Sequence, residues 1–192
     1  MAIDGYMYFL DYGGTFLPSE SQVDTKDATE NLFKDFKFSD AANAKALFEI
    51  EDFSFDIEQA LNIGSQSTGA GAGRVTFNPF SITRKIDKAS PVLFERACSG
   101  TPYQQVALGM RKGSGGAMSG QIYLVFLFKL VAVKTIAWSY DDESPKETTT
   151  FEYGGLQVHY TPQKPDGKAD TVAKGGWNRV KNVKDQTMDP IK

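Results

Sequence analysis

Residues 74–100 constrain the fold of this chain more than any other stretch, because they read in turn as a strand, a break, a helix and a stop. The apolar residues Val75, Phe77, Phe80 and Ile82 are typical of a β-strand. Pro79 has no N–H to donate to a neighbouring strand, so it predicts a local interruption of the ladder. One helix following such a broken strand indicates a β structure that the helix plugs or flanks.

The helix has recognisable ends. Ser90 is expected to cap its first turn, Pro91 suits the first helical position, and Gly100 accepts the left-handed backbone that ends a helix. Cys98 is the single cysteine, so it cannot form an internal disulfide, and it is predicted to be a buried and unreactive thiol. The apolar face that the helix offers for burial consists of Leu93, Phe94, Ala97 and Cys98.

The rest of the chain reads as strands joined by turns. No repeat and no change of composition divides the 192 residues, so one domain spanning residues 1–192 is expected. The predicted fold is all-β with one short helix, a closed β-barrel of two antiparallel sheets. Strand patterns occupy residues 5–12, 47–58, 75–86, 103–111, 121–138, 147–160 and 175–183.

Three of these patterns carry further detail. Residues 121–138 are apolar at both parities, which predicts a strand that is buried on both faces. The apolar set changes phase near Glu51-Asp52 and again across Gly154-Gly155. A one-residue slip moves side chains to the other face, so each phase change predicts a β-bulge.

Charge and hydropathy exclude two classes of partner. The net charge of −3 argues against a protein that binds nucleic acid by neutralising phosphates. The first residues lack the basic region of a signal peptide. The most apolar run, residues 122–133, contains Lys129 and is shorter than the ~20 residues that span a bilayer. We therefore expect neither nucleic-acid binding nor membrane insertion.

Residues that perform catalysis or bind metals are scarce. The only histidine, His159, lies within a strand pattern, is expected to face solvent, and has no nucleophile elbow near it. One histidine and one cysteine are too few for a His/Cys metal site. The glycine-rich residues 60–73 lack the spacing of a phosphate-binding loop. We therefore expect no enzyme activity, no cofactor and no metal.

Three alternatives stay open on the residues alone. A carboxylate pair for glycoside hydrolysis needs only spatial proximity, which no spacing in the chain reveals. The acidic residues Asp141, Asp142 and Glu143 offer oxygen ligands for a weak calcium contact. Trp138 and Trp177 are suited to a sugar platform, although packing in an aromatic core is the simpler interpretation.

Three motifs carry a resemblance to a known family. They are FSITRKIDKASPVLFERACSG from residue 80, QIYLVFLFKLVAV from residue 121, and VHYTPQKPDGKADTVAKGGWN from residue 158. Together these motifs resemble the haemolysin-coregulated protein (Hcp) family, the tube proteins of type VI secretion, and the resemblance covers residues 48–183. Residues 22–46 depart from the family pattern as an insertion or loop, and the resemblance gives no role for them.

The resemblance implies both an architecture and an assembly. Family members are β-barrels of two sheets with one flanking helix, similar to a tail tube, that close into a homohexamer with a wide lumen. The rings stack into the inner tube, which carries small effector proteins and works with a spike protein of the VgrG type, sheath and baseplate proteins. Such a protein is assembled in the bacterial cytoplasm and exported without a signal peptide, into the extracellular space or a target cell.

Site residues follow from matching positions. Ser54 and Asp56 are expected to point into the lumen and contact cargo, and residues 57–74 correspond to the extended loop that reaches the neighbouring ring. The last residues, 184–192, are expected to fray. The glycines that suit a close inter-ring contact are Gly64, Gly69, Gly71 and Gly73. The two-sided apolar strand offers surface for closing the ring through Tyr123, Val125 and Leu127.

Other functions are compatible with the same sequence. A specialised paralogue would use residues 22–46 as a docking element for cargo or a partner. A contractile phage-type tail tube subunit would share the architecture within a different machine. A tube domain fused to a toxin is disfavoured, since the segment after Tyr160 is too short for a folded toxin domain. The last alternative is a monomeric carbohydrate-binding sandwich.

Overall fold

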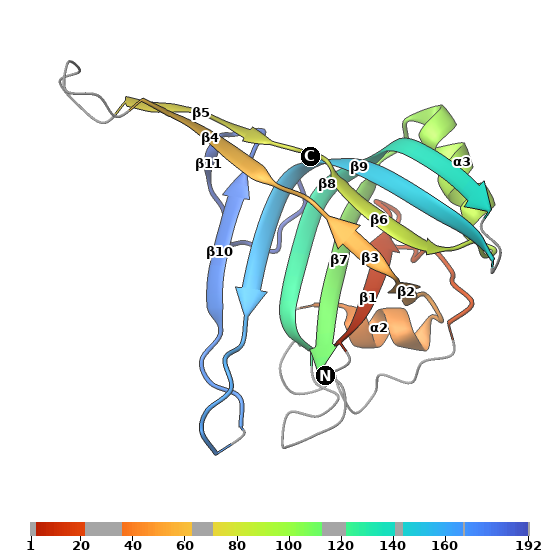
Figure 1. Cartoon of the computed structure of the whole chain (residues 1–192), viewed down its shortest axis with the longest axis horizontal. Helices are drawn as coiled ribbons and strands as arrows, with labels where there is room; N and C mark the ends of the chain where they lie inside the picture. The colour runs from red at the N-terminus through yellow and green to blue at the C-terminus, as the bar shows by residue number, and fades with distance from the viewer. Residues whose placement is uncertain are drawn as a thin grey trace.

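A computed structural model describes residues 3–21, 36–62, 71–112, 122–140, 144–166 and 168–191, and the predicted mainly β fold is confirmed (Figure 1). Two helices occur in this part of the chain, α2 (Phe38–Asn43) and α3 (Ser90–Ser99). The strands are β1 (Ile3–Leu10), β2 (Phe48–Ile50), β3 (Asp52–Ser54), β4 (Ile57–Asn62), β5 (Gly71–Phe77), β6 (Phe80–Lys85), β7 (Tyr103–Lys112), β8 (Ile122–Tyr140), β9 (Pro145–Tyr160), β10 (Ala173–Asn178) and β11 (Val183–Lys184).

One antiparallel sheet wraps around the core. Its order is β11-β10-β9-β8-β7-β1-β2, with β6 added to β9 and β3 added to β6. Between β2 and β3, Glu51 donates its backbone N–H to the carbonyl of Thr83 in β6, at 2.9 Å. Among the described residues no ladder joins β2 to β6. Residues 48–54 instead link the two ends of the wrap, because β2 pairs with β1 and β3 pairs with β6. The predicted bulge at Glu51 is therefore a switch from β1 to β6.

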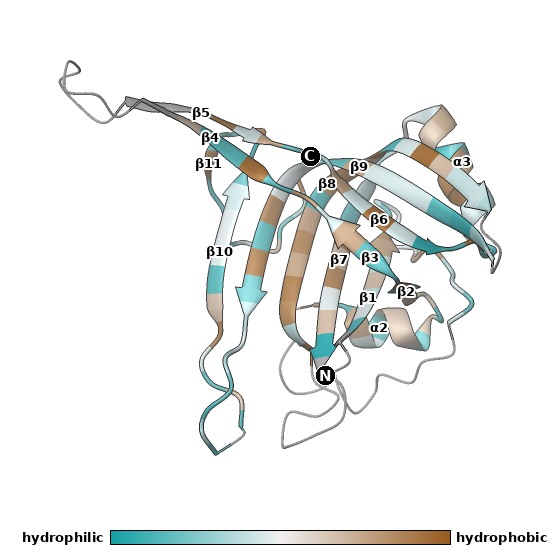
Figure 2. Ribbon diagram, viewed as in Figure 1, coloured by the Kyte–Doolittle hydropathy of each residue, from teal (hydrophilic) through white to brown (hydrophobic). Residues whose placement is uncertain are grey.

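Aromatic rings fill the interior of the wrap. Phe80 of β6 stacks on Phe128 of β8, with centroids 4.0 Å apart, and on Phe151 of β9 at 4.8 Å. Leu93 of α3 is fully buried in the same cluster. Hydrophobic residues, brown in Figure 2, lie in bands along β8, whereas β10 is largely hydrophilic or neutral. The break that Pro79 predicted is confirmed, because β5 ends at Phe77 and β6 begins at Phe80.

A second hydrophobic cluster covers the opposite face of β1, β7 and β8. Phe36 and Phe38 pack there beside Val125 and Leu127, so β8 is buried on both faces over its first part, as predicted. The cover comes from residues 36–47 of the same chain, most of which were predicted to belong to an inserted loop. The buried members of this cluster are Tyr8, Leu10, Phe36, Phe38, Ala41, Ala46, Leu47, Ala107, Ile122, Val125 and Leu127.

Two predictions are wrong for the same reason, which is that side chains from distant parts of the chain pack together there. His159 is buried, with its ring edge-on to Phe36 at 4.7 Å. Residues 185–191 pack onto the sheet, where the buried Lys129 ammonium lies 3.4 Å from an oxygen of Asp185. Ile191 near the C-terminus is only 6% exposed, so this segment does not fray.

The predicted helix is confirmed, but its buried face is narrower than the sequence indicated. Gly100 ends α3 with a left-handed φ of 67°. Leu93 is buried, whereas Phe94 is 48% exposed and Cys98 is exposed. The ring of Phe94 lies against Trp138 at the sheet margin, with centroids 5.9 Å apart. The helix therefore covers the margin of the wrap and leaves the Cys98 thiol accessible.

The predicted bulge at Gly154-Gly155 is also wrong. Lys129 pairs with Gly155 and Val131 pairs with Tyr153 in one continuous register. The register shift lies instead on β8, between Val133 and Thr135. Apolar residues appear at both parities of β9 because the core-facing set changes from Phe151 and Tyr153 to Leu156 and Val158, all of which pack in the first cluster. The change occurs where Leu130 of β8 has a positive φ of 51°.

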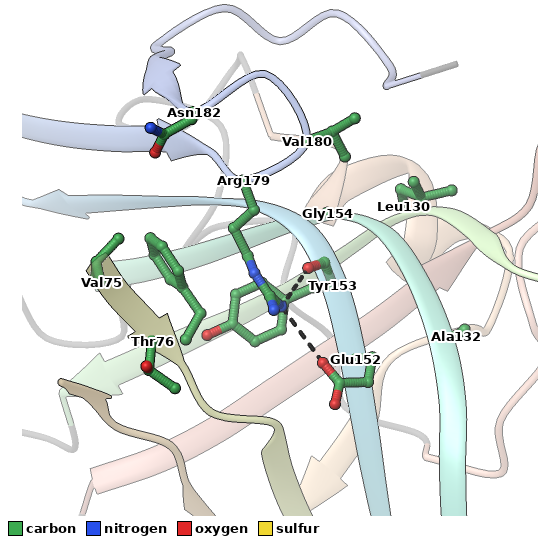
Figure 3. Close-up of a pocket in the computed structure, with 11 residues that line it drawn as sticks. Val75, Thr76, Leu130, Ala132, Glu152, Tyr153, Gly154, Arg179, Val180 and Asn182 are labelled. Carbon is green, nitrogen blue, oxygen red and sulfur yellow. Dashed lines mark hydrogen bonds and ion pairs between the residues drawn. The ribbon is translucent and has the colours of Figure 1, made fainter. Parts of the chain in front are cut away.

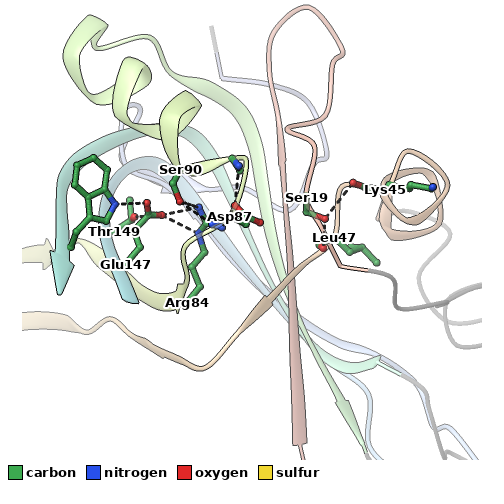
Figure 4. Close-up of polar contacts among 10 residues, drawn as sticks. Ser19, Lys45, Leu47, Arg84, Asp87, Ser90, Glu147 and Thr149 are labelled. Carbon is green, nitrogen blue, oxygen red and sulfur yellow. Dashed lines mark hydrogen bonds and ion pairs between the residues drawn. The ribbon is translucent and has the colours of Figure 1, made fainter. Parts of the chain in front are cut away.

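A buried arginine joins β6, β9 and α3 (Figure 4). Arg84 is 2% exposed and donates through Nε to Glu147 Oε1 at 3.0 Å. It also donates through Nη1 to Asp87 at 2.6 Å and through Nη2 to the Ser90 hydroxyl at 3.1 Å. Its guanidinium lies over the ring of Phe48 in β2, at 5.1 Å. Ser90 therefore begins α3 by accepting from Arg84, and its side chain does not cap the helix.

We expect Phe38→Ala to destabilise the fold by about 3–5 kcal/mol, because the ring is fully buried in the second cluster and its loss leaves a cavity. Phe94→Ala is the matched control on α3, where the ring is half exposed and a smaller loss follows. Urea denaturation of both variants measures the difference. Equal midpoints for the two variants would show that residues 36–47 are an accessory and not part of the core.

Replacing Glu147 by Gln is expected to cost about 3–5 kcal/mol, since the Arg84 charge then loses its buried counter-ion. Glu51→Gln is the control, because its ion pair with Lys146 is partly exposed and is worth at most about 1 kcal/mol. The free energy of unfolding from denaturant titration is the measurement. A Glu147→Gln chain as stable as Glu51→Gln would contradict the central role of the Arg84 cluster.

Candidate functional site

A row of hydroxyl side chains crosses four strands on the outer face of the wrap. Ser54 of β3 lies opposite Ser81 of β6, Ser81 lies opposite Thr150 of β9, and Thr150 lies opposite Thr135 of β8. The strands alternate, so Phe80 and the other apolar neighbours point into the core while these four side chains point away from it. The row results from the pairing register of β3, β6, β9 and β8, and it brings together segments more than fifty residues apart in the sequence.

A second row lies beside the first. Thr83 of β6 is opposite Thr148 of β9, and their hydroxyl oxygens are 3.3 Å apart. In the first row, Thr150 donates to the Ser81 hydroxyl at 3.5 Å. We call this surface the hydroxyl face, and its members are Ser54, Ser81, Thr83, Thr135, Thr148 and Thr150.

Charged side chains flank the hydroxyl face and pair with one another. Lys146 lies 3.6 Å from Glu51 on one side, and Lys134 lies 2.9 Å from Glu152 on the other. The hydroxyl side chains are neutral, and each of them both donates and accepts hydrogen bonds. Asp52 of β3 lies opposite Thr83, so the second row also carries an exposed carboxylate. Such a surface can hold a polar protein surface by hydrogen bonds.

The structure separates the two residues that were predicted to contact cargo. Ser54 is exposed on the hydroxyl face, which agrees with the predicted orientation away from the core. Asp56 lies beyond the end of β3, where its carboxylate accepts from the side-chain amide of Asn78 at 2.6 Å. The other hydroxyl residues were not predicted, although polar and apolar residues alternate in FSITRK from residue 80 and in KETTTF from residue 146.

The segment predicted as an extended loop is a β-ribbon over its described residues. Strands β4 and β5 pair with each other and with no strand of the main sheet in the described chain, and the ribbon projects away from the body (Figure 1). Gly71 and Gly73 lie in β5. Gly64 and Gly69 lie outside the described residues. The predicted extended segment thus contains a paired β-ribbon, and its role in contact between rings stays a proposal.

An open cleft of about 1240 Å³ lies at the base of the ribbon (Figure 3). Burial alone would raise the pKa of Glu152 in this cleft, but hydrogen bonds from Lys134 and Arg179 lower it below the usual value. Burial raises the pKa of Tyr153 to about 12, so its hydroxyl stays protonated and donates to the carbonyl of Asn78 at 3.1 Å. The lining residues are Val75, Thr76, Phe77, Leu130, Ala132, Glu152, Tyr153, Gly154, Arg179, Val180 and Asn182.

The residues predicted to close a ring divide into two kinds. Val125 and Leu127 are fully buried under the second cluster, so their side chains offer no surface to a neighbouring subunit. Tyr123 is half-buried, with its ring edge-on to the exposed Tyr160 at 6.3 Å. Only Tyr123 of these three is therefore available for a contact between subunits.

Chemistry-bearing clusters are absent from the part of the chain that the structure describes. No group of three His, Cys, Asp or Glu side chains is placed there to hold a metal ion. Neither described helix is long and apolar enough to cross a membrane. Trp138 is half exposed, but its indole N–H donates to Glu147 at 2.8 Å, which ties it to the Arg84 cluster. Asp141, Asp142 and Glu143 lie outside the described residues.

Sequence comparison defines the class of protein. The family described as type VI secretion system effector, Hcp, matches residues 39–160, which is more than half of the chain, so the chain belongs to the Hcp family. Protein hcp1 of Pseudomonas aeruginosa (strain PAO1) is 37% identical over 114 residues, covering 57% of this chain and 68% of that protein.

Solved structures share the fold over nearly the whole chain. A type six secretion system protein matches with a TM-score of 0.74 at 22% identity, covering 96% of this chain and 100% of the other. Hcp1 from Salmonella typhimurium matches with a TM-score of 0.66 at 20% identity, covering 96% and 99%. The secreted protein Hcp3 from Pseudomonas aeruginosa gives 0.59 at 16% identity, covering 92% and 98%. At these identities the likeness concerns the fold alone.

Acid is expected to remove the stabilisation that ionised Glu152 gives the fold at the base of the ribbon. Because the pKa of Glu152 lies below the ordinary value of 4.5, its ionised form stabilises the folded chain above that pH, and the contribution is lost as the pH falls through the lowered pKa. Wild type should therefore exceed Glu152→Gln in free energy of unfolding near neutral pH, and the difference should shrink as the pH falls below 4.5 and through the lowered pKa. Denaturant curves across that range test this, and a difference that persists unchanged in acid would contradict it.

Proposed function

We propose that the chain is a structural subunit of the type VI secretion inner tube, which forms hexameric rings that stack and carry small effector proteins. The observation that carries the proposal is the match of residues 39–160 to the Hcp family. The ribbon and the hydroxyl face supply the two surfaces that a stacked carrier needs, one for a neighbouring ring and one for cargo. Spike, sheath and baseplate proteins are the further partners that this function requires.

The hydroxyl face is the proposed lumen surface. Its hydroxyl members are neutral and the charges of Lys134 and Lys146 are paired, so cargo would be held mainly by hydrogen bonds, with the carboxylate of Asp52 as the charged group beside them. Ser54 lies at the end of the first row, on β3, and Thr135 lies at its other end, on β8. The row thus spans the width of one subunit across four strands.

The second hydrophobic cluster limits which residues could serve as the docking element of a specialised paralogue. Residues 36–46 contribute Phe36, Phe38, Ala41 and Ala46 to the core, so a docking role for the whole predicted insertion conflicts with their burial. A docking element would have to lie within residues 22–35. Deleting only those residues, and following ring formation and cargo retention, is the appropriate test of that alternative.

The first experiment is the mass in solution, by light scattering, with negative-stain images of the same fraction. We expect a mass of six chains and annular particles. A monomer at all concentrations would contradict the tube function for the isolated chain and favour an adaptor or binding module. A carbohydrate-binding function would instead give hits on a glycan array.

Substitutions on the hydroxyl face test the cargo surface. Ser54→Gln and Thr135→Gln place a bulkier side chain at opposite ends of one row, and we expect both to reduce retention of a co-expressed small effector at least about tenfold while rings persist. Ser99→Gln is the control, because Ser99 is exposed and lies on α3, outside the four strands that form the row. Unchanged retention in both variants would contradict the assignment of the hydroxyl face to the lumen.

A further inference from the structure

The orientation of the β4–β5 ribbon relative to the body is not fixed by strand pairing. Strands β4 and β5 pair only with each other in the described chain, so no ladder fixes the direction of the ribbon relative to the body. Two strands alone are marginally stable in water. Asn78 donates through its backbone N–H to the carbonyl of Asp56, at 3.1 Å, which ties the two strands to each other and not to the body. The open cleft beside the base leaves room for the ribbon to swing.

Two side chains span this junction, Tyr153, whose hydroxyl donates to the carbonyl of Asn78 at 3.1 Å, and Arg179. The guanidinium carbon of Arg179 lies 5.2 Å from the ring centroid of Phe77, the last residue of β5, and 5.0 Å from the ring centroid of Tyr153 in β9. Arg179 Nη1 donates to the carbonyl of Tyr153 at 2.6 Å and lies 3.4 Å from Glu152 Oε2. Figure 3 shows Arg179 reaching from the turn after β10 towards Tyr153 and Glu152.

The backbone of Arg179 is fixed as well as its side chain. Its N–H donates to the carbonyl of Gly154 at 2.8 Å, so the turn that carries it is anchored on β9. A planar guanidinium can contact two aromatic rings and still donate in its own plane, whereas a lysine ammonium on a flexible stem cannot. Arg179 therefore connects Phe77 of the ribbon to Tyr153 of the body through a side chain whose own position is fixed.

We propose that Arg179 is the positioning residue that sets the direction in which the β4–β5 ribbon leaves the body. The residue acts through Phe77, which it holds against Tyr153. The consequence for ring stacking rests on the proposed function. A ribbon with a fixed direction can meet the same surface on every neighbouring copy. Arg179 thereby controls stacking between rings and leaves the closure of a single ring to other surfaces.

Distance measurement between spin labels tests the position of the ribbon directly. One label is attached to the exposed Cys98 on α3, and the other to Glu58→Cys, an exposed position on β4. Labelled chain is diluted with unlabelled chain, so that only distances within one subunit are read. We expect one narrow distribution in the parent and a broad one in Arg179→Ala, because the ratio of docked to free ribbon falls up to about tenfold when the one cation–π contact between Arg179 and the ribbon, the contact with Phe77, is lost.

Two further variants separate geometry from charge. Arg179→Lys keeps the charge near Glu152 but loses the stacking, so we expect a broad distribution there too. Arg111→Ala is the matched control, because Arg111 also lies over an aromatic ring, Tyr6 at 5.4 Å, and pairs with Asp4 at 3.8 Å, yet both partners lie on β1 and neither belongs to the ribbon. It should leave the distribution narrow. A narrow distribution in Arg179→Ala overturns the proposal, and a narrow one in Arg179→Lys alone overturns the requirement for stacking.

Sedimentation of the same variants then tests the consequence. We expect Arg179→Ala to keep the mass of a ring but to lose pelletable tubes at least about tenfold relative to Arg111→Ala. Pelletable tubes in equal amount from both variants would overturn the link to stacking. If the parent chain forms no rings at all, the proposed function fails, while the label distances in the monomer still decide whether Arg179 fixes the ribbon.

Discussion

The buried charge of Arg84 is the constraint on which the arrangement of this fold depends. A guanidinium that is 2% exposed must have its charge and its N–H groups satisfied by nearby acceptors. Glu147 of β9, Asp87 in the turn after β6, and Ser90 at the start of α3 supply them. The β6–β9 register and the position of α3 are therefore coupled, because moving either one leaves a buried charge without its partner.

The same cluster also explains how one strand serves two surfaces. Glu147 is fully buried, and its second oxygen accepts from the Trp138 indole N–H. Thr148, the next residue, points to the opposite side and joins the hydroxyl face, since successive side chains of a strand alternate. Locking Glu147 on Arg84 thus fixes the register that brings hydroxyls from β3, β6, β9 and β8 into rows. A shift of one residue would place the carboxylate on the proposed cargo surface.

Local signals predicted the local features of this fold correctly. Pro79 marks the break between β5 and β6, and Gly100 ends α3, because proline and glycine act through their own backbone. The apolar run of β8 predicted burial on both faces, and the family motifs predicted the β fold. One of the six members of the hydroxyl face was also predictable, since Ser54 was expected to point away from the core and is exposed.

Features that depend on distant segments were not predictable in this way. Burial of His159 requires Phe36, and burial of Lys129 requires Asp185 from the C-terminal segment, so no window around either residue contains the cause. The hydroxyl rows require the register of four strands that lie far apart in sequence. The exposed Cys98 depends on where the axis of α3 meets the sheet, which helical periodicity does not determine.

The ribbon shows how function draws on the least stable part of such a chain. It buries little against the body, so its order rests on the few contacts at its base and on whatever surface it meets in an assembly. Tyr153 serves both ends of this arrangement, with its ring in the aromatic core and its hydroxyl on the carbonyl of Asn78. Tyr153 thus links the base of the ribbon to the aromatic core. An element that must reach a second copy can in this way stay thin and extended, provided that its base is held by the rigid wrap.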